Sequence, residues 1–129
     1  MDQPVAPGLT GRAEMVVGKQ DTAIAHGSGN VEVLATPAMV ALMEKAALAS
    51  VEPFLGSGQT TVGTGVNVRH LSATPVGMRV RAEAELAAVE GKRLVFKVAA
   101  YDEREMIGTG THERYIVEKG RFLARVAGK

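Results

Sequence analysis

The chain has 129 residues, of which 46% are hydrophobic and 22% are charged, and fifteen basic residues against fourteen acidic ones leave a formal net charge of +1. A chain of this length usually forms one domain, so a single domain over residues 1–129 is expected, and the near balance of charge argues against nucleic-acid binding. Because the sequence contains no cysteine, disulfides, thiolate catalysis and cysteine-ligated zinc or iron–sulfur sites are excluded.

The N-terminal segment has the features of neither a signal peptide nor a membrane anchor. Residues 1–4 lack a basic stretch followed by apolar residues, and no apolar run in the chain approaches the ~20 residues that cross a bilayer. We therefore expect a cytoplasmic protein with no membrane partner. Residues 1–8 contain two prolines and a glycine, and they are expected to form a loose lead-in.

The first predicted strand covers residues 9–17, where apolar residues alternate with polar ones. Residues 19–30 are polar and rich in glycine, so a loop is expected there. A short apolar stretch over residues 31–35 then leads into the one clear helix of the sequence.

A strong helix-start signal stands at Thr36 and Pro37. Thr36 suits the N-cap, because its hydroxyl can accept a hydrogen bond from an unpaired amide, and Pro37 suits the first helical position, where a missing N–H costs nothing. Residues 38–49 are rich in good helix formers. Glu52 precedes Pro53 and is expected to end the helix, because a residue before proline is pushed out of the α region.

Glu44 is the anomaly of this helix. At about 100° per residue, Lys45 and Glu52 fall on a narrow solvent stripe, whereas Glu44 lies among apolar residues such as Val40 and Leu48. A helix that is apolar on nearly every side must be buried against other elements, and a curved sheet that wraps around the helix can bury it. We therefore expect the Glu44 side chain to be kept out of water.

The rest of the chain is predicted to be β-structure in an antiparallel meander, because the strands follow one another with short turns. Apolar and charged residues alternate most clearly over residues 78–89, and further strands are expected over residues 94–101 and 107–117. The strand over residues 60–71 is expected to point His70 inward. One face of that strand carries Val62, Thr64, Val66, Val68 and His70.

One strand, a long buried helix and four antiparallel strands follow the element order of the hotdog fold. In this α+β architecture an antiparallel sheet wraps around one central helix. A helix-on-sheet α+β fold of another topology is the competing interpretation. The sequence contains no repeat of ~20–50 residues.

Glu44 and His70 are the residues whose surroundings point to chemistry. Glu44 is either a carboxylate bonded to backbone amides at a helix edge or dimer seam, or a nucleophile or general base tuned by burial. An inward histidine is, taken alone, more often a satisfied core residue than a catalyst. A glutamate in the same small core favours chemistry, because the two side chains can exchange a proton if they meet.

The other polar residues of interest fit structural roles. Thr36 is explained by capping, although a hydroxyl at a helix N-terminus also lies where an anionic or carbonyl oxygen is favoured. We interpret His112, beside Glu113 and Arg114 on the last strand, as structural and the loop residue His26 as solvated. The spacing of the three histidines matches no metal motif, and neither GxGxxG nor GxSxG occurs, so no metal and no cofactor are expected.

Three segments together resemble the fluoroacetyl-CoA thioesterase family of single-hotdog enzymes. They are ATPAMVALME over residues 35–44, VGTGVNVRHLSATP over residues 62–75, and GTGTHER over residues 108–114. The similarity runs from about residue 8 to residue 122. Any one segment alone is a weak signal, and the combination of all three is what makes the resemblance specific.

The resemblance implies a homodimer that hydrolyses acyl-CoA thioesters without a metal, with each active site built at the interface from both subunits. It implies a catalytic set of Thr36, Glu44 and His70, with Gly63 and Arg114 as substrate-binding residues. The fluoroacetate-specific enzyme carries phenylalanines before the helix, whereas residues 27–35 contain no aromatic residue here. Fluoroacetyl-CoA is therefore not the expected substrate.

Our leading hypothesis is an acyl-CoA thioesterase that acts on a small acyl group. Glu44 would serve as nucleophile or as base for water, His70 as proton donor or orienting partner, and Thr36 would bind the thioester carbonyl or attack it. The sequence leaves open whether Glu44 or Thr36 attacks. The alternatives are a hotdog acyl-thioester hydratase or dehydratase, and a non-enzymatic acyl-CoA-binding dimer in which Glu44 and His70 merely satisfy each other.

Overall fold

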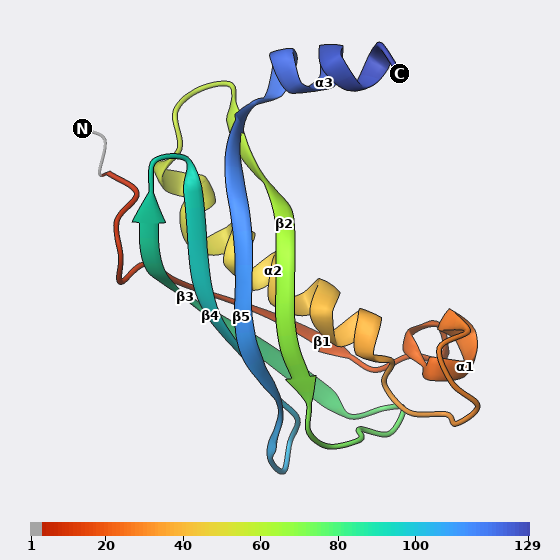
Figure 1. Cartoon of the computed structure of the whole chain (residues 1–129). Coiled ribbons are helices and arrows are strands. Elements are labelled where there is room, and N and C mark those ends of the chain that lie inside the picture. The colour runs from red at the N-terminus through yellow and green to blue at the C-terminus, as the bar shows by residue number, and fades with distance from the viewer. Residues whose placement is uncertain (1–3) are drawn as a thin grey trace.

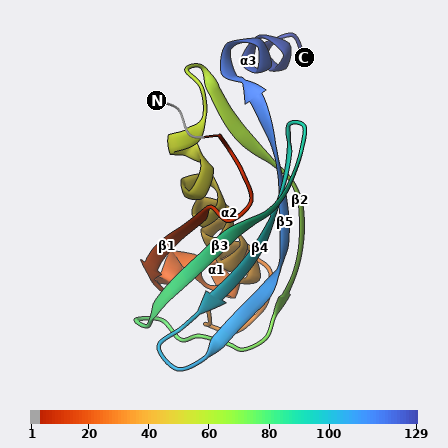
Figure 2. The same ribbon diagram turned by 90° about the vertical axis from the view of Figure 1, so that its left-hand side faces the viewer.

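The computed structural model describes residues 4–129 and shows a five-stranded antiparallel sheet curled around one long helix (Figures 1 and 2). The strand order is β1-β3-β4-β5-β2, and α2 lies across the inner face of the sheet. This arrangement confirms the predicted α+β hotdog fold. The elements are β1 (Thr10–Val16), η1 (Lys19–Asp21), α1 (Ala23–His26), α2 (Thr36–Val51), η2 (Glu52–Phe54), β2 (Gln59–His70), β3 (Arg79–Glu90), β4 (Arg93–Tyr101), β5 (Met106–Glu118) and α3 (Lys119–Ala127).

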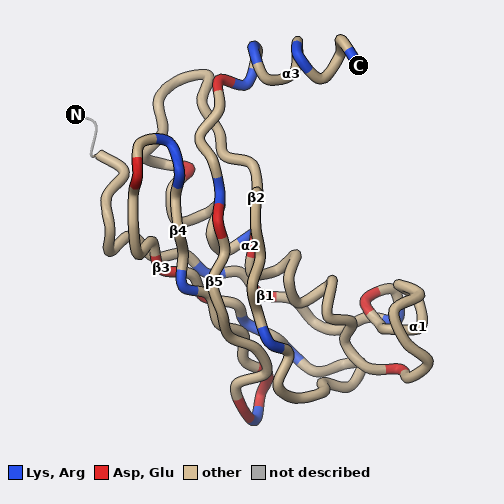
Figure 3. Tube along the Cα trace, viewed as in Figure 1, with Lys and Arg blue, Asp and Glu red and all other residues tan. Residues whose placement is uncertain are grey.

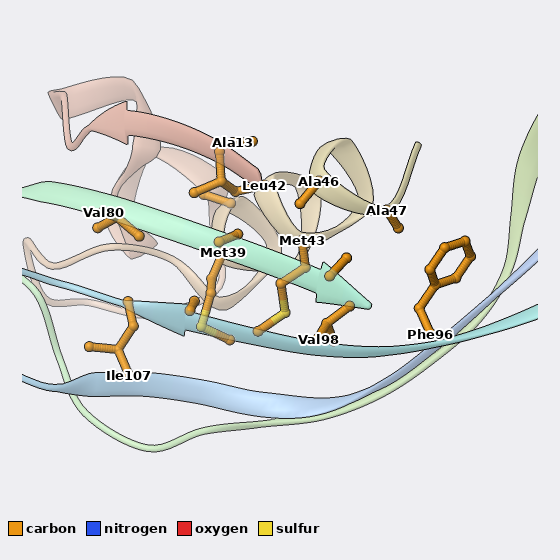
Figure 4. Close-up of a cluster of buried hydrophobic side chains, with 14 of the residues drawn as sticks. Ala13, Met39, Leu42, Met43, Ala46, Ala47, Val80, Phe96, Val98 and Ile107 are labelled. Carbon is orange, nitrogen blue, oxygen red and sulfur yellow. The ribbon is translucent and has the colours of Figure 1, made fainter. Parts of the chain in front are cut away.

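The core lies between α2 and the inner face of the sheet. In β3 the alternation seen in the sequence turns four apolar residues toward α2, and each of them is at most 3% exposed. Met39 and Met43 of α2 point toward Ile107 and Val98 of the sheet (Figure 4). The buried residues of α2 recur at a spacing of three and four, as expected for one helical face. They are Ala38, Met39, Leu42, Met43, Ala46, Ala47, Ser50 and Val51.

The sheet covers only one side of α2. Lys45 is exposed as predicted, but Ala41 is exposed as well, and Val40 and Leu48 are only half-buried. The expectation that α2 is buried on nearly every side is therefore wrong for a single chain, because the five strands of the sheet surround only part of the helix.

The strand order corrects the predicted meander. β3, β4 and β5 do form an antiparallel meander with short turns. β2 departs from it, because β2 pairs with β5 and not with its sequence neighbour β3. The connection over residues 71–78 therefore crosses to the other side of the meander, and β2 becomes an edge strand. Turn length alone did not reveal this crossover.

Thr36 is the first residue of α2 and not its cap, which corrects the predicted N-terminus by one position. Ala35 occupies the N-cap with an extended backbone and makes no side-chain capping bond. Pro37 lies within the first turn, where it is tolerated as predicted. The Thr36 hydroxyl is thus available for a contact with another element. At the other end, Pro53 lies in η2, just beyond the last turn of α2.

Two segments contain helices that the sequence did not predict. The expected loop over residues 19–30 holds η1 and α1, and α3 follows β5, where β-structure was expected to the end of the chain. Helix α3 extends away from the sheet, and its charged residues are all basic (Figures 1 and 3). No helix in the described part of the chain is long and apolar enough to cross a membrane.

Part of the predicted lead-in can be placed. Residues 1–3 lie outside the described residues. Val5 packs against the core, and the Gly8 amide donates to the carbonyl of Leu86 at 2.8 Å. The segment just before β1 is thus tied to β3.

Gly11 of β1 lies directly against α2, and this close approach provides a test. A Cβ at Gly11 would lie 2.7 Å from the amide nitrogen of Ser50 and closer still to the carbonyl oxygen of Ala46, both of which belong to the helix backbone. Backbone atoms cannot swing aside, so Gly11→Ala should lower the free energy of unfolding by about 1–3 kcal/mol in urea denaturation. Gly120→Ala is the matched control, because a Cβ there meets nothing. Equal stability of the two variants would contradict this packing.

Candidate functional site

A β-bulge in β2 shapes the centre of the candidate site. Gly63 lies opposite Arg114 of β5, but the next pair is Gly65 opposite Glu113, so Thr64 is an extra residue in β2. An extra residue reverses the alternation of the strand and bends it locally, and such bulges are enriched beside active sites. Because Gly63 and Gly65 flank Thr64, the backbone of this bulge carries no side chain on either side of Thr64.

The bulge also corrects the predicted facing of β2. Val62 lies opposite Tyr115, which is exposed on the outer face, whereas Thr61 is buried on the inner face. The prediction that Val62 and Thr64 share a face with His70 is therefore wrong. His70 itself points inward as expected, because it meets the first residue of α2.

Glu44, Gly63 and Arg114 lie together on the inner side of this bulge. The Arg114 side chain is only 8% exposed, and its Nη1 lies 3.8 Å from Oε2 of Glu44. A Cβ at Gly63 would lie 2.6 Å from the same carboxylate oxygen, so the absence of a side chain at Gly63 makes room for Glu44. Arg114 also donates from Nε to the hydroxyl of Thr61 at 2.8 Å.

Glu44 is more accessible than the sequence predicts. Its side chain is 40% exposed, because it projects from the half-covered side of α2 beside Val40 and Leu48. The expectation that Glu44 is kept out of water is not met within one chain. Its carboxylate is held beside a buried guanidinium and can still be reached from outside.

Thr36 and His70 form the second polar group. The Thr36 hydroxyl oxygen lies 2.7 Å from Nδ1 of His70, so the hydroxyl donates when Nδ1 carries no proton. Both side chains line a cavity of about 540 Å³. The opposite wall of this cavity comes from the segment before α2, including Ser28, Val31 and Val33, and contains no aromatic residue.

The two polar groups are separate within one chain. Thr36 and Glu44 stand eight residues apart on α2, which is about 12 Å along the helix axis. The ionic partner of Glu44 is Arg114, and the partner of His70 is Thr36. In one chain the five residues singled out in the sequence thus form two groups, and the structure does not bring Glu44 to His70.

The electrostatics of the site keep its imidazoles neutral. Burial lowers the pKa of His70, against an opposite effect from the backbone of Ser72. Burial likewise lowers the pKa of His112. Burial also lowers the pKa of Arg114, and the negative charge of Glu44 opposes that shift. Neutral imidazoles can accept protons, which is what a general base requires.

Sequence reasoning missed the surroundings of Arg114. Thr61 was not singled out, and His112 was interpreted as structural, although both contact this group of side chains. One signal was available, because His112 and Arg114 have the same parity on one strand and therefore share a face. The bulge has a signal as well, because a glycine inside a strand often marks a bulge or a close backbone approach, and Gly63 and Gly65 stand inside β2.

Comparison with known proteins identifies the family of this chain. Residues 17–120 match the family described as Fluoroacetyl-CoA-specific thioesterase. The fluoroacetyl-CoA thioesterase of Streptantibioticus cattleyicolor is 45% identical over 98 residues, which cover 76% of this chain and 70% of that protein.

Solved structures give the same picture. A fluoroacetyl-CoA thioesterase structure superimposes with a TM-score of 0.91 at 36% identity, covering 98% of each chain. A thioesterase-superfamily member from Thermus thermophilus gives a TM-score of 0.89 at 34% identity, with 97% of this chain and 93% of that chain covered. These relatives are named as thioesterases, so they do not favour the hydratase, dehydratase or binding-protein alternatives. The chain belongs to the fluoroacetyl-CoA-specific thioesterase family.

Proposed function

We propose that the protein hydrolyses a small acyl-CoA thioester to the free acid and coenzyme A. Family membership supports the reaction class. The observation that carries the proposal is the 2.7 Å contact between the Thr36 hydroxyl and Nδ1 of His70 at the wall of the 540 Å³ cavity. A hydroxyl bonded to a neutral imidazole is the pairing that activates a nucleophile for acyl transfer.

The Thr36–His70 pair favours Thr36 over Glu44 as the attacking residue. In the proposed reaction the Thr36 oxygen bonds to the thioester carbon while its proton passes to Nδ1 of His70. The carbon–sulfur bond then breaks, and the imidazolium returns the proton to the CoA thiolate. The start of α2 lies beside this centre, where the helix dipole favours the negative oxygen of the intermediate.

Glu44 acts in the second half of this proposed reaction. Water must attack the Thr36 ester to release the acid, and a carboxylate can take the proton from that water. The bond between the ester carbon and the Thr36 oxygen then breaks, and the proton passes to the Thr36 oxygen to restore the hydroxyl. The cation of Arg114 stands beside Glu44 and can bind the carbonyl oxygen or the product carboxylate. The backbone of Gly63 gives the substrate access to both.

A second copy of the chain completes the proposed site. Residues 63–67 of the edge strand β2 are all exposed, and an exposed edge readily pairs with another strand. The half-covered side of α2 offers Val40 and Leu48 for burial beside that edge. In such a homodimer the Thr36–His70 group of one protomer would face Glu44 of its partner.

The cavity wall favours an acyl group other than fluoroacetyl. The segment before α2 lines it with small and aliphatic residues such as Gly29 and Val33. An aromatic lid over the acyl group is therefore not part of this site. The cytoplasmic location expected from the sequence completes the proposal, because coenzyme A thioesters are metabolites of that compartment.

Replacing Glu44 tests the assignment of its carboxylate. Glu44→Gln keeps the size of the side chain and removes the base, so kcat should fall about 100-fold or more while the fold persists. Thiol release from acetyl-, isobutyryl- and benzoyl-CoA measures the loss, and Glu85→Gln, which changes an exposed carboxylate on β3, is the control. Wild-type turnover by Glu44→Gln would reject the role of Glu44. Failure of the unmodified protein to release thiol from any of these thioesters would reject the proposed function.

Acid should inactivate the enzyme only below the ordinary pKa of histidine. His70 must be neutral to accept the Thr36 proton, and burial lowers its pKa from 6.5, so the acid limb of kcat should lie below pH 6.5. The stability of the fold should also decrease as the pH falls. The unfolded chain binds protons more tightly at His70 and His112, so the thermal midpoint should decline as pH falls below about 6.5. An acid limb centred above pH 6.5 would contradict the assignment, and His26→Asn should leave both profiles unchanged.

Gly63→Ala separates fold from function at the bulge. The added methyl would lie 2.6 Å from Oε2 of Glu44, the end of a flexible side chain that can move aside. We therefore expect a stability within about 1 kcal/mol of the parent, and a kcat lower by about 10–100-fold, since the carboxylate is displaced. Thermal melting and thiol release measure the two effects, with Gly120→Ala as control. An unchanged kcat would show that the position of Glu44 is not critical.

A further inference from the structure

The buried imidazole of His112 makes two hydrogen bonds of opposite kind. Nδ1 lies 2.8 Å from the carbonyl oxygen of Gly65, and Nε2 lies 3.2 Å from Nη1 of Arg114. A carbonyl only accepts, so Nδ1 carries the proton, and a guanidinium only donates, so Nε2 offers its lone pair. These contacts fix a single neutral tautomer.

The surroundings of His112 hold that ring in place. The residue is 2% exposed, and its ring stacks on Phe96 with centroids 6.1 Å apart. The carbonyl of Gly65 reaches it because the extra residue Thr64 breaks the regular pairing of β2 with β5 at this point. The bulge therefore orients the imidazole as well as the backbone of the site.

Arg114 is held on three sides by these elements. Its Nε and Nη2 donate to the hydroxyl and the carbonyl of Thr61 at 2.8 and 2.9 Å, and Nη1 donates to His112. Because the guanidinium is planar, these bonds fix its plane and leave Nη1 directed also toward Glu44, 3.8 Å away. The position of the cation beside the carboxylate depends on both Thr61 and His112.

We propose that His112 is a positioning residue of the thioesterase site, which aims Arg114 at Glu44 by accepting a hydrogen bond at Nε2. The role rests on the proposed function, because it matters for turnover only if Glu44 and Arg114 act on the thioester. His112 itself touches neither the cavity wall nor the Thr36–His70 pair.

The charges that face His112 agree with a neutral ring. Burial lowers the pKa of His112, and the charge of Arg114 adds to that effect. The hydrogen bond to the Gly65 carbonyl and the charges of Glu44 and Glu113 act in the opposite direction. A proton on Nε2 would remove the acceptor and place a second cation against the guanidinium. Protonation of His112 would therefore release Arg114 from its position.

Two substitutions separate the two hydrogen bonds of His112. In His112→Asn the shorter side chain places its amide group where Nδ1 was, so it can still donate to the carbonyl of Gly65. No atom then remains at the position of Nε2 to accept from Arg114. The amide of His112→Gln reaches as far as Nε2 and can accept from Arg114. We expect kcat for acetyl-CoA to fall about 10–100-fold in His112→Asn, with KM changed less than about threefold, and to recover in part in His112→Gln. His26→Asn, an exposed histidine, is the control and should match the parent.

A wild-type kcat in His112→Asn, or a loss seen only in KM, would overturn the proposal. A measurement on the unmodified protein decides the matter even if both variants fail to fold. The nitrogen chemical shifts of ¹⁵N-labelled His112 at pH 7 should show a protonated Nδ1 and an unprotonated Nε2. A charged ring or the opposite tautomer would overturn the proposal. Because this readout needs no turnover, it stays valid if no thioester is cleaved and the proposed function fails.

Discussion

The spacing of Thr36 and Glu44 on one rigid helix is the constraint that governs this molecule. Eight residues of α2 separate them by about 12 Å, and α2 is clamped to the sheet along its buried face. Neither side chain can approach the other without disrupting the core. Thr36 instead makes a hydrogen bond with His70 of β2, and Glu44 forms an ion pair with Arg114 of β5. A single chain therefore carries two half-sites, and the proposed dimer is the means of joining them.

Strand β2 connects the two half-sites. His70 ends it, and the bulge at Thr64 lies six residues earlier in the strand, beside Glu44. Gly63, beside the bulge, has no side chain where the Glu44 carboxylate needs room. The bulge also turns the Gly65 carbonyl toward His112. The same strand is one of the two edge strands of the sheet, and its residues 63–67 are exposed. The segment that shapes the proposed chemistry is thus also available for pairing with a second copy.

The sequence predicted those features that arise from local patterns. The alternation over residues 78–89 and the run of helix formers after Pro37 placed β3 and α2 within one or two residues of their observed ends, and the element order predicted the hotdog fold. The pairing of β2 with β5 could not be predicted in this way, because a link of eight residues fits a hairpin neighbour and a crossover equally well. Helix α3 escaped notice because it has few core contacts and no capping side chain.

The residues of the candidate site were singled out from the sequence, but their arrangement was not predicted. Glu44 was noticed because a carboxylate interrupts an apolar face, yet the exposure of that face depends on how far the sheet reaches, which no helical wheel shows. The one-residue shift at Thr36 turned a predicted cap into a partner for His70. The bulge depends on one extra residue in a glycine-bearing strand, and no alternation pattern signals which residue that is.

Subunit complementation tests the central claim that two chains build each site. A mixture of Glu44→Gln and His70→Asn protomers, each inactive as a homodimer, should regain about a quarter of the parent activity after refolding together. Half of the dimers would then be mixed, and each mixed dimer would hold one intact site of two. If Thr36, His70 and Glu44 of the same chain acted together, every mixed dimer would contain two damaged sites. Mixed dimers that form and yet show no activity would contradict the account.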